Sequence, residues 1–222
     1  MARRIIGAAF VSLDGVMQAP GGPDEDRSGE FPFGGWLAGL DEEAIGNQVD
    51  TFLRPPFDLL LGRRTYEIFA AYWPFIPAEN PIAAMFASCG KFVLTRSDQP
   101  LEWQKSHRLA GIDAVEELKA TQGPDLVIQG SSTLYPPLLE RGLIDRLVLT
   151  IAPLVLGGGK RLFGEGTPAG TFRPVETRVS PGGTVMATLE PAGPVRTGTF
   201  DNPPPPSEAE LARRASIAAG TW

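Results

Sequence analysis

The sequence is poor in the residues that build disulfides and metal sites. It contains one cysteine, Cys89, and one histidine, His107, in 222 residues. A single cysteine excludes an intrachain disulfide and fits a reducing compartment, so we expect a cytoplasmic protein. One cysteine and one histidine cannot assemble a Cys/His zinc site, and no acidic run has EF-hand spacing. We therefore expect no metal centre.

Positive charge is also scarce. Lysine and arginine total 20 against 26 acidic residues, which gives a net charge of −6. Nucleic-acid-binding proteins carry a basic stripe or patch, and none is visible here, so we expect no nucleic-acid partner. The first apolar run begins at Ile5 and is interrupted by Ser12 and Asp14. It is too short for a signal-peptide core or a membrane span, and we expect no membrane partner.

Short apolar segments alternate with helical patterns along most of the chain. We expect strands at Ile5–Leu13, Phe57–Leu61, Lys91–Leu94, Asp125–Gln129, Ile144–Ile151, Phe172–Ser180 and Val185–Glu190. We expect helices at Asp41–Phe52, Arg64–Tyr72, Pro81–Ser88, Ile112–Thr121 and Thr133–Arg141. This alternation predicts an α/β fold with helices on both faces of a mostly parallel sheet, and the last two strands form a hairpin that makes the sheet mixed.

The chain divides into one domain, residues 1–190, and a Pro-rich tail, residues 191–222. In the tail, Pro203–Pro206 predicts a stiff polyproline segment. A short helix should follow over Ser207–Ala219, with Ser207 as N-cap and Glu210 at the capping-box position. We interpret the tail either as loose or as an arm that docks on a partner subunit.

A long loop and a helix start are expected in the first quarter of the chain. The segment Ala19–Gly35 is rich in Gly, Pro and Asp, and a loop of this length in a compact domain is usually a binding loop or a lid. Asp41 is the expected N-cap of the helix that follows.

Three segments share the pattern of a strand that ends in a Gly, Ser, Thr or Arg turn. They are Leu61–Glu67, Thr95–Ser97 and Gln129–Leu134. Backbone N–H groups at such helix starts bind phosphate, and arginine offers a planar fork for phosphate oxygens. Taken singly, each could be an ordinary helix start or polar loop. Because all three follow strands of one sheet, together they predict a dinucleotide phosphate site. The Rossmann pattern Gly-x-Gly-x-x-Gly is absent.

These segments recur in this order in a known family. Phe10–Gly15, Leu61–Glu67, Gln129–Leu134 and Pro153–Gly159 together resemble the dihydrofolate reductase-like family, in particular the C-terminal reductase domain of the riboflavin-biosynthesis deaminase–reductase. The zinc signature of the deaminase part is absent, so the chain resembles the stand-alone reductase form. The resemblance covers about residues 3–190 and implies a three-layer α/β/α fold, NADPH as hydride donor and a homodimer.

The resemblance also implies site residues. Asp14 would border the substrate pocket. Gly158 and Gly159 would lie near the nicotinamide. The other cofactor-binding residues implied are Gly62, Arg63, Thr65, Thr95, Arg96, Ser97, Gly130, Ser131, Ser132, Thr133 and Leu134. Within this set, the turn Thr95–Ser97 would surround the adenosine 2′-phosphate.

Three further residues are candidates from their chemistry. A carboxyl with a raised pKa can protonate a substrate nitrogen, and Asp14 is the candidate catalytic residue, although an Asx-type turn with Gly15 is an equal interpretation. Trp73, next to the helix-breaking Pro74, could stack on a flat ligand. Trp36 could be a lid residue or a buried anchor of its loop.

We therefore predict an NADPH-dependent reductase that transfers hydride to a small flat heterocyclic or carbonyl substrate of pteridine or pyrimidine type. The alternative is a catalytically silent nucleotide-binding or assembly module, because the sequence places no clear catalytic acid or base.

Overall fold

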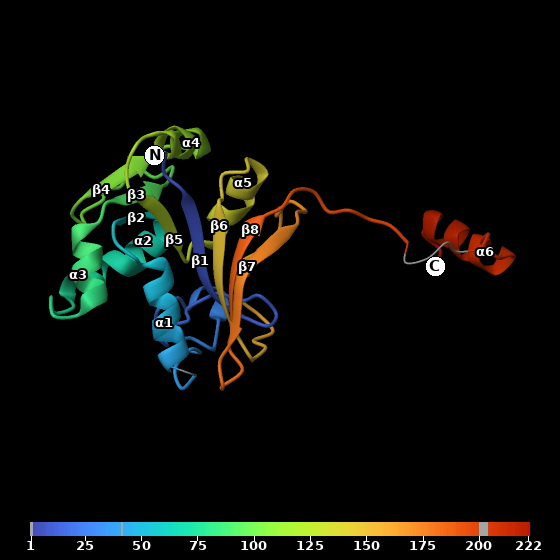
Figure 1. The fold of residues 1–222 in the computed structure, drawn as a ribbon, viewed down its shortest axis with the longest axis horizontal. Coiled ribbons are helices and arrows are strands. Elements are labelled where there is room, and N and C mark those ends of the chain that lie inside the picture. Colours follow the sequence, from blue (N-terminus) through green and yellow to red (C-terminus); the bar gives the residue numbers. More distant parts are fainter. Residues whose placement is uncertain (1, 41, 200–203) are drawn as a thin grey trace.

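The structure is a computed structural model that describes residues 2–40, 42–199 and 204–222 (Figure 1). Two of the predictions involve residues that the structure does not describe. The N-cap residue Asp41, and Pro203 of the polyproline segment, lie outside the described residues.

Eight strands form one sheet in the order β4-β3-β2-β5-β1-β6-β8-β7. The strands are β1 Ile5–Ser12, β2 Phe57–Gly62, β3 Lys91–Leu94, β4 Ser106–Leu109, β5 Asp125–Gln129, β6 Arg146–Ala152, β7 Phe172–Val179 and β8 Val185–Pro191. The pairs from β4 to β6 are parallel, and β8 pairs antiparallel with both β6 and β7. The predicted mixed, mostly parallel sheet is confirmed.

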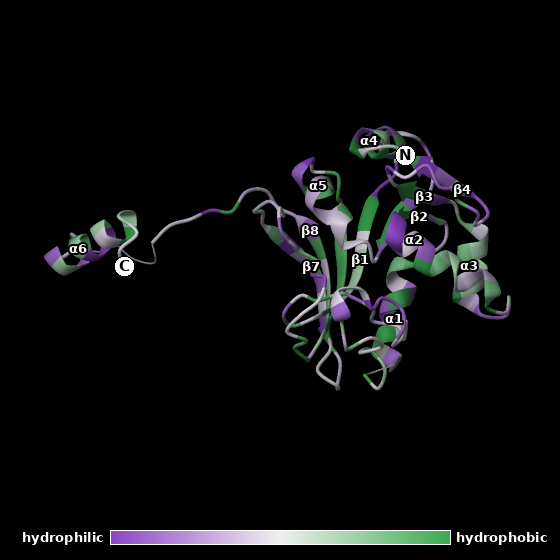
Figure 2. Ribbon diagram, turned by 180° about the vertical axis from the view of Figure 1, so that it is seen from behind, coloured by the Kyte–Doolittle hydropathy of each residue, from purple (hydrophilic) through white to green (hydrophobic). Residues whose placement is uncertain are grey.

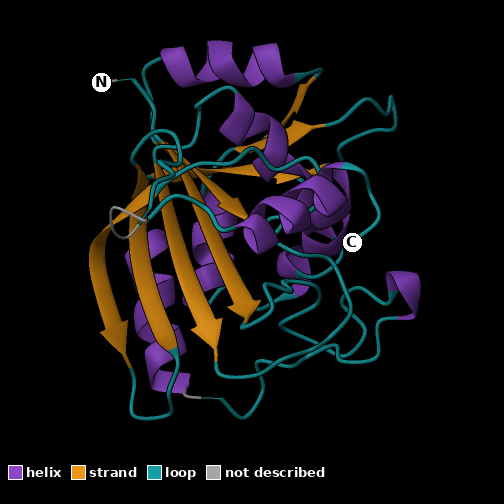
Figure 3. Cartoon of the chain, turned by 90° about the vertical axis from the view of Figure 1, so that its right-hand side faces the viewer, coloured by secondary structure: helices purple, strands orange, loops and turns teal. Residues whose placement is uncertain are grey.

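Helices cover both faces of the sheet (Figures 1 and 3). The α-helices are α1 Glu42–Phe52, α2 Arg63–Ala70, α3 Pro81–Ser88, α4 Ile112–Ala120, α5 Tyr135–Glu140 and α6 Glu208–Ala218. Short 3₁₀ helices are η1 Ser28–Glu30, η2 Trp73–Phe75 and η3 Ser132–Leu134. Helices α4 and α5 pack on one face of the sheet, and α1, α2 and α3 pack on the other, which gives three layers. No helix within the described ranges is long and apolar enough to cross a membrane.

Because side chains alternate along a strand, a single strand such as β2 contributes to the hydrophobic cores on both faces of the sheet. Every residue of β2 is buried. Leu60 joins the core cluster under α4 and α5, whereas Leu59 and Leu61 join the cluster under α1 to α3. Successive side chains point to opposite faces of a strand, so a strand covered on both sides reads as a continuous apolar run. The central strands accordingly stand out as hydrophobic in Figure 2.

Two elements differ from the sequence-based expectation. The predicted helix over Thr133–Arg141 is divided into η3 and α5, with Pro136 and Pro137 in the first turn of α5. The strand β4 was not predicted, because Ser106–Leu109 is short, half polar and lies at the sheet edge, where no apolar pattern is required. The other boundaries agree to within about two residues, the usual uncertainty of helix and strand ends.

The tail leaves the sheet after β8 and carries α6 away from the body of the domain (Figure 1). The Ser207 hydroxyl accepts a hydrogen bond from the Glu210 N–H at 3.2 Å, so the predicted N-cap is confirmed. Leu211 and Trp222 are 52% and 82% exposed, and no residue of α6 is buried. The described residues of the tail, 191–199 and 204–222, therefore add nothing to the core of the domain.

A buried ion pair fixes the N-terminus to the sheet. Arg3 Nη1 donates to Asp58 Oδ2 at 2.6 Å, and the Gly90 N–H donates to Asp58 Oδ1 at 2.7 Å. Both charged side chains are nearly buried, at 10% and 13% exposure. Losing one partner of such a pair leaves an uncompensated buried charge.

We expect Asp58→Asn to lower the free energy of unfolding by about 3 kcal/mol, because Arg3 would stay buried without its carboxylate. Urea unfolding followed by circular dichroism measures this. The matched control is Asp125→Asn, which removes the half-buried partner of the exposed Arg4 and should cost less than about 1 kcal/mol. Equal losses in the two variants would contradict the interpretation.

We expect removal of residues 196–222 to change the free energy of unfolding by less than about 0.5 kcal/mol, because residues 196–199 and 204–222, the part of this segment that the structure describes, include no buried side chain. Thermal unfolding of the full and shortened chains at equal concentration tests this. A clear loss of stability in the shortened chain would mean that α6 packs against the domain or a partner.

Candidate functional site

The sheet opens between two neighbouring parallel strands. Pairing between β1 and β5 stops at Ala8 and Gln129, whereas β1 continues its pairing with β6 as far as Ser12 and Ala152. Beyond Ala8, the β5 side of β1 therefore faces open space. In α/β sheets, ligands bind at the carboxyl ends of strands where neighbouring strands part in this way.

A cavity of about 1010 Å³ fills this opening, and we call it the central cavity. Its floor is Ala8–Phe10 of β1. One wall is made by Gly62–Thr65 and Gln129–Thr133, which follow β2 and β5, and we call it the turn wall. The opposite wall is the loop residues 17–26 together with Lys160, and we call it the loop wall. This volume is at the upper end of the range of small-molecule and cofactor sites, about 300–1,000 Å³.

Two hydrogen bonds join the two halves of the turn wall. The Gly62 N–H donates to Ser131 Oγ at 2.8 Å, and the Ser131 N–H donates to Thr65 Oγ1 at 3.0 Å. Gly130 and Ser131 both have left-handed backbone, with φ of 76° and 57°. That conformation is uncommon for serine and costs about 1 kcal/mol or more, and such residues cluster at ligand sites.

The turn wall fits a diphosphate. A methyl group added to Gly130 would lie 3.0 Å from Thr65 Cγ2. Glycine therefore lets the backbone of this turn lie close to the Thr65 side chain. The helices that begin at Arg63 and Ser132 have no side-chain cap, so no side chain occupies their first N–H groups. N–H groups at helix starts, with hydroxyls beside them, form the donor set that phosphate oxygens accept from.

The two arginines of the turn wall have different roles. Arg63 Nε pairs with Glu67 at 2.6 Å, and Arg63 Nη1 donates to the Gln99 carbonyl at 3.0 Å, which ties the start of α2 to the loop after β3. Arg64 is exposed and has no hydrogen bond or ion pair to another residue of the described chain. Arg64 is thus the guanidinium available to an anion in the central cavity.

The loop wall is held by its own polar side chains. Gln18 is 4% exposed, its amide donates to the carbonyls of Asp26 and Ser28 at 2.9 and 2.8 Å, and its Oε1 accepts from the Lys160 N–H at 3.0 Å. The Lys160 ammonium forms an ion pair with Asp26. Residues of the predicted binding loop therefore do line the cavity.

Glu25 is the least compensated carboxylate of the loop wall. Its Oε2 accepts from the Gly21 N–H at 2.7 Å, and no arginine or lysine pairs with it in the described part of the chain. Burial raises the pKa of this carboxyl, opposed by hydrogen bonds from Gly21 and Gly22.

Asp14 lies outside the central cavity. Its carboxylate accepts from Ser12 Oγ at 2.6 Å, from the Leu156 N–H at 3.1 Å and from the Gly157 N–H at 2.9 Å. These bonds lower the pKa of Asp14 to about 2, in the direction opposite to a proton donor. Asp14 thus fixes the loop after β6 to the end of β1, and its catalytic role stays a prediction.

Trp36 is a buried anchor and does not line the central cavity. The ring is 9% exposed, packs with Val16 and Phe31, and donates from Nε1 to the Gln18 carbonyl at 2.8 Å. Of the two interpretations of this residue, the anchor is therefore the correct one. Trp73 does line the cavity, and it packs edge-on against Phe86 with ring centroids 5.0 Å apart.

Several residues expected at the cofactor lie near the central cavity without lining it. The turn Thr95–Ser97 follows β3, next to β2, so it shares the sheet edge of the turn wall. Thr95 Oγ1 accepts from the Ser97 N–H at 3.1 Å, and the Arg96 side chain is exposed. Leu134 is buried in the core, at 3% exposure.

Gly158 and Gly159 lie beside the cavity, and Lys160 is the residue of their segment that lines it. Gly159 has φ of 118°, and an added methyl group would lie 2.8 Å from Val16 Cγ1 and 2.9 Å from Phe31 Cε2. This glycine therefore permits close packing against the loop rather than contact with the cavity.

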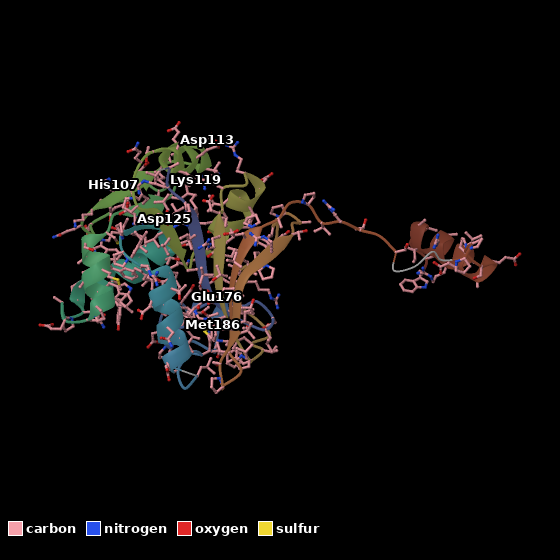
Figure 4. All side chains as sticks on the ribbon, in the orientation of Figure 1. His107, Asp113, Lys119, Asp125, Glu176 and Met186 are labelled. Carbon is pink, nitrogen blue, oxygen red and sulfur yellow. The ribbon has the colours of Figure 1, made fainter. Side chains whose placement is uncertain are left out.

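The single histidine and the single cysteine, His107 and Cys89, do not line the central cavity. His107 lies on β4, at the edge of the sheet, stacked on Phe92, and Figure 4 shows it near the end where Asp113 and Lys119 gather. Cys89 is buried, and burial raises the pKa of its thiol to about 11. Among the described residues, no three His, Cys, Asp or Glu side chains are grouped to hold a metal ion.

Comparison with known proteins agrees with this geometry. Residues 3–186 match the family model of the RibD C-terminal domain. YyaP, an uncharacterised protein of Bacillus subtilis (strain 168), is 29% identical over 188 residues, which is 83% of this chain and 93% of YyaP.

Two solved structures share the fold. A provisionally named riboflavin biosynthesis protein from Shewanella sp. PV-4 superposes with a TM-score of 0.64 at 23% identity, over 86% of this chain and 99% of that one. Dihydrofolate reductase from Enterococcus faecalis, complexed with NADP(H) and RAB-propyl, superposes with a TM-score of 0.56 at 16% identity, over the same shares. The fold is therefore the dihydrofolate reductase-like, reductase-type fold, and because the family model covers most of the sequence, the chain belongs to the family of the RibD C-terminal domain.

Proposed function

We propose that this protein is an NADPH-dependent reductase that transfers hydride to a small flat heterocyclic or carbonyl substrate of pteridine or pyrimidine type. The observation that carries the proposal is the turn wall, where two strand-end turns are joined through Thr65 and Ser131 and present uncapped helix starts to one cavity. Membership of the RibD C-terminal domain family supports it, as does the NADP(H) complex of the E. faecalis reductase with the same fold.

In this proposal the turn wall holds the cofactor diphosphate. The N–H groups at the starts of α2 and η3 donate to its oxygens, and the Arg64 guanidinium balances its charge. The adenosine end extends along the sheet edge from β2 to β3, where Arg96 faces the 2′-phosphate. Bound NADPH supplies the hydride, and the chain supplies position and surroundings.

The rest of the cavity orients the two reacting molecules. The floor, Ala8–Phe10, is the open side of β1, and a flat ring can lie against it where β5 no longer pairs. Trp73 and Met17 add apolar walls that exclude water, which strengthens the remaining polar contacts. Because Asp14 lies outside the central cavity and its carboxylate accepts from Ser12, Leu156 and Gly157, bound water rather than Asp14 supplies the proton in this proposal.

The position of Asp14 outside the central cavity also favours a second candidate function, a nucleotide-binding module without turnover. This module would bind NADPH but would not oxidise it in the presence of pteridine, aminouracil or quinone-like acceptors. Steady-state NADPH oxidation with one such acceptor would eliminate it.

The expected homodimer and the cytoplasmic location stay predictions. The strand β7, at the end of the sheet, exposes Val175 and Val179 and has an open edge on which a second chain could pair.

We expect the protein to bind NADPH more tightly than NADH, measured by energy transfer from tryptophan, chiefly Trp73, to the nicotinamide. Arg96→Gln should weaken NADPH binding about tenfold and leave NADH binding unchanged, since only NADPH carries the 2′-phosphate. Arg64→Gln should weaken both ligands. Arg54→Gln, exposed and ahead of β2, is the control. Absence of binding at millimolar NADPH would refute the proposed function.

We expect Gly130→Ala to weaken NADPH binding at least about tenfold, because the new methyl group meets Thr65 where the turn receives the diphosphate. The matched control is Gly142→Ala. Gly142 also has positive φ, at 62°, but nothing lies within 4 Å of the added carbon. Both variants should lose about 1 kcal/mol of stability from backbone strain, and only Gly130→Ala should lose affinity. Similar affinities in the two variants would argue against the turn as the phosphate site.

A further inference from the structure

The charges that line the central cavity are mostly neutralised by one another. Arg63 pairs with Glu67 at 2.6 Å, and Lys160 pairs with Asp26. Asp24 pairs with Arg27, which lies outside the cavity lining, at 2.6 Å. Two charged residues are left among the described residues that line it, namely Arg64 and Glu25.

These two residues lie on opposite walls. Arg64 belongs to the turn wall and Glu25 to the loop wall. The cavity thus offers one unpaired cation on the side of the phosphate-type turns and one unpaired carboxylate on the side that remains for a second ligand. Lys160, the cation of the loop wall, is occupied by Asp26 and by Ser28 Oγ at 2.6 Å.

Glu25 is fixed rather than free to turn away. Its Oε2 accepts from the Gly21 N–H at 2.7 Å, four residues earlier in the same loop. The loop itself is held through Gln18 to the Asp26 and Ser28 carbonyls. A carboxylate that lines a cavity and lacks a cation accepts hydrogen bonds from ligand N–H groups and repels ligand anions.

We propose that the substrate of this site is a neutral or cationic nitrogen-rich molecule without a phosphate group, and that Glu25 selects it by accepting its N–H donors. This inference rests on the proposed function, since it assigns the turn wall to the cofactor and the loop wall to the substrate. A phosphorylated substrate would place its anion opposite Glu25, with Lys160 already engaged and Arg64 on the cofactor side.

A matched pair of probes tests the selection. The probes are 6-hydroxymethylpterin, which has ring N–H and amino donors, and its phosphate ester. Each is titrated into the NADPH-saturated protein while the energy transfer to nicotinamide is followed, and isothermal titration calorimetry gives the dissociation constants. We expect the unphosphorylated probe to bind at least about tenfold more tightly than its ester.

The variant Glu25→Gln keeps an oxygen for the Gly21 N–H and removes the charge. It should weaken binding of the unphosphorylated probe about tenfold and reduce the discrimination against the ester. Glu25→Lys should reverse the preference. Glu30→Gln is the control, because Glu30 is exposed in the same loop and does not line the central cavity.

The outcomes separate this inference from the proposed function. Tight NADPH binding with equal or stronger binding of the ester, or with no effect of Glu25→Gln, overturns the inference and leaves the cofactor site standing. If neither probe binds the NADPH-saturated protein, the assignment of Glu25 to pterin-like N–H donors is overturned as well. Failure to bind NADPH at all instead overturns the proposed function.

Discussion

The central cavity depends on where two parallel strands stop pairing. β5 ends at Gln129, opposite Ala8, whereas β1 continues for four more residues to Ser12 and stays paired with β6. The backbone past Ala8 thus has a partner on one side only. Helices α4 and α5 pack on one face of the sheet and α1 to α3 on the other, and the start of α2 lines the opening. The turns after β2 and β5 then meet across a short gap, and the Ser131 and Thr65 hydroxyls close it. The central cavity arises here from the length of one strand.

Much of this frame could be predicted from the sequence. Strands buried on both faces, such as β2, are continuous apolar runs. The turn at Gly62 is indicated by a glycine followed by arginine and threonine. The fold class, the hairpin that makes the sheet mixed and the N-cap at Ser207 follow from the same local chemistry. The strand β4 could not be predicted, because an edge strand of four residues carries almost no pattern of its own.

The loop wall was less accessible to prediction, since its residues act through partners distant in the chain. Gln18 meets the Lys160 N–H across 142 residues, and the sequence alone does not bring them together. The only available signal was an unusual Gly- and Pro-rich loop with three consecutive acidic residues, Asp24–Asp26. The surroundings of Asp14 were hidden for the same reason. Its neighbours Ser12 and Gly15 are visible in the sequence, whereas the Leu156 and Gly157 N–H groups that donate to its carboxylate are distant in the chain.

The loop between β1 and α1 makes many of its hydrogen bonds to itself. Gln18 spans to Asp26 and Ser28, Glu25 to Gly21, and Trp36 returns to the Gln18 carbonyl. These hydrogen bonds hold the segment in one arrangement through its own side chains and carbonyls. Immobilising a flexible loop would subtract ordering entropy from the binding free energy of every ligand. Here that ordering is completed during folding, so the segment reaches the ligand preorganised.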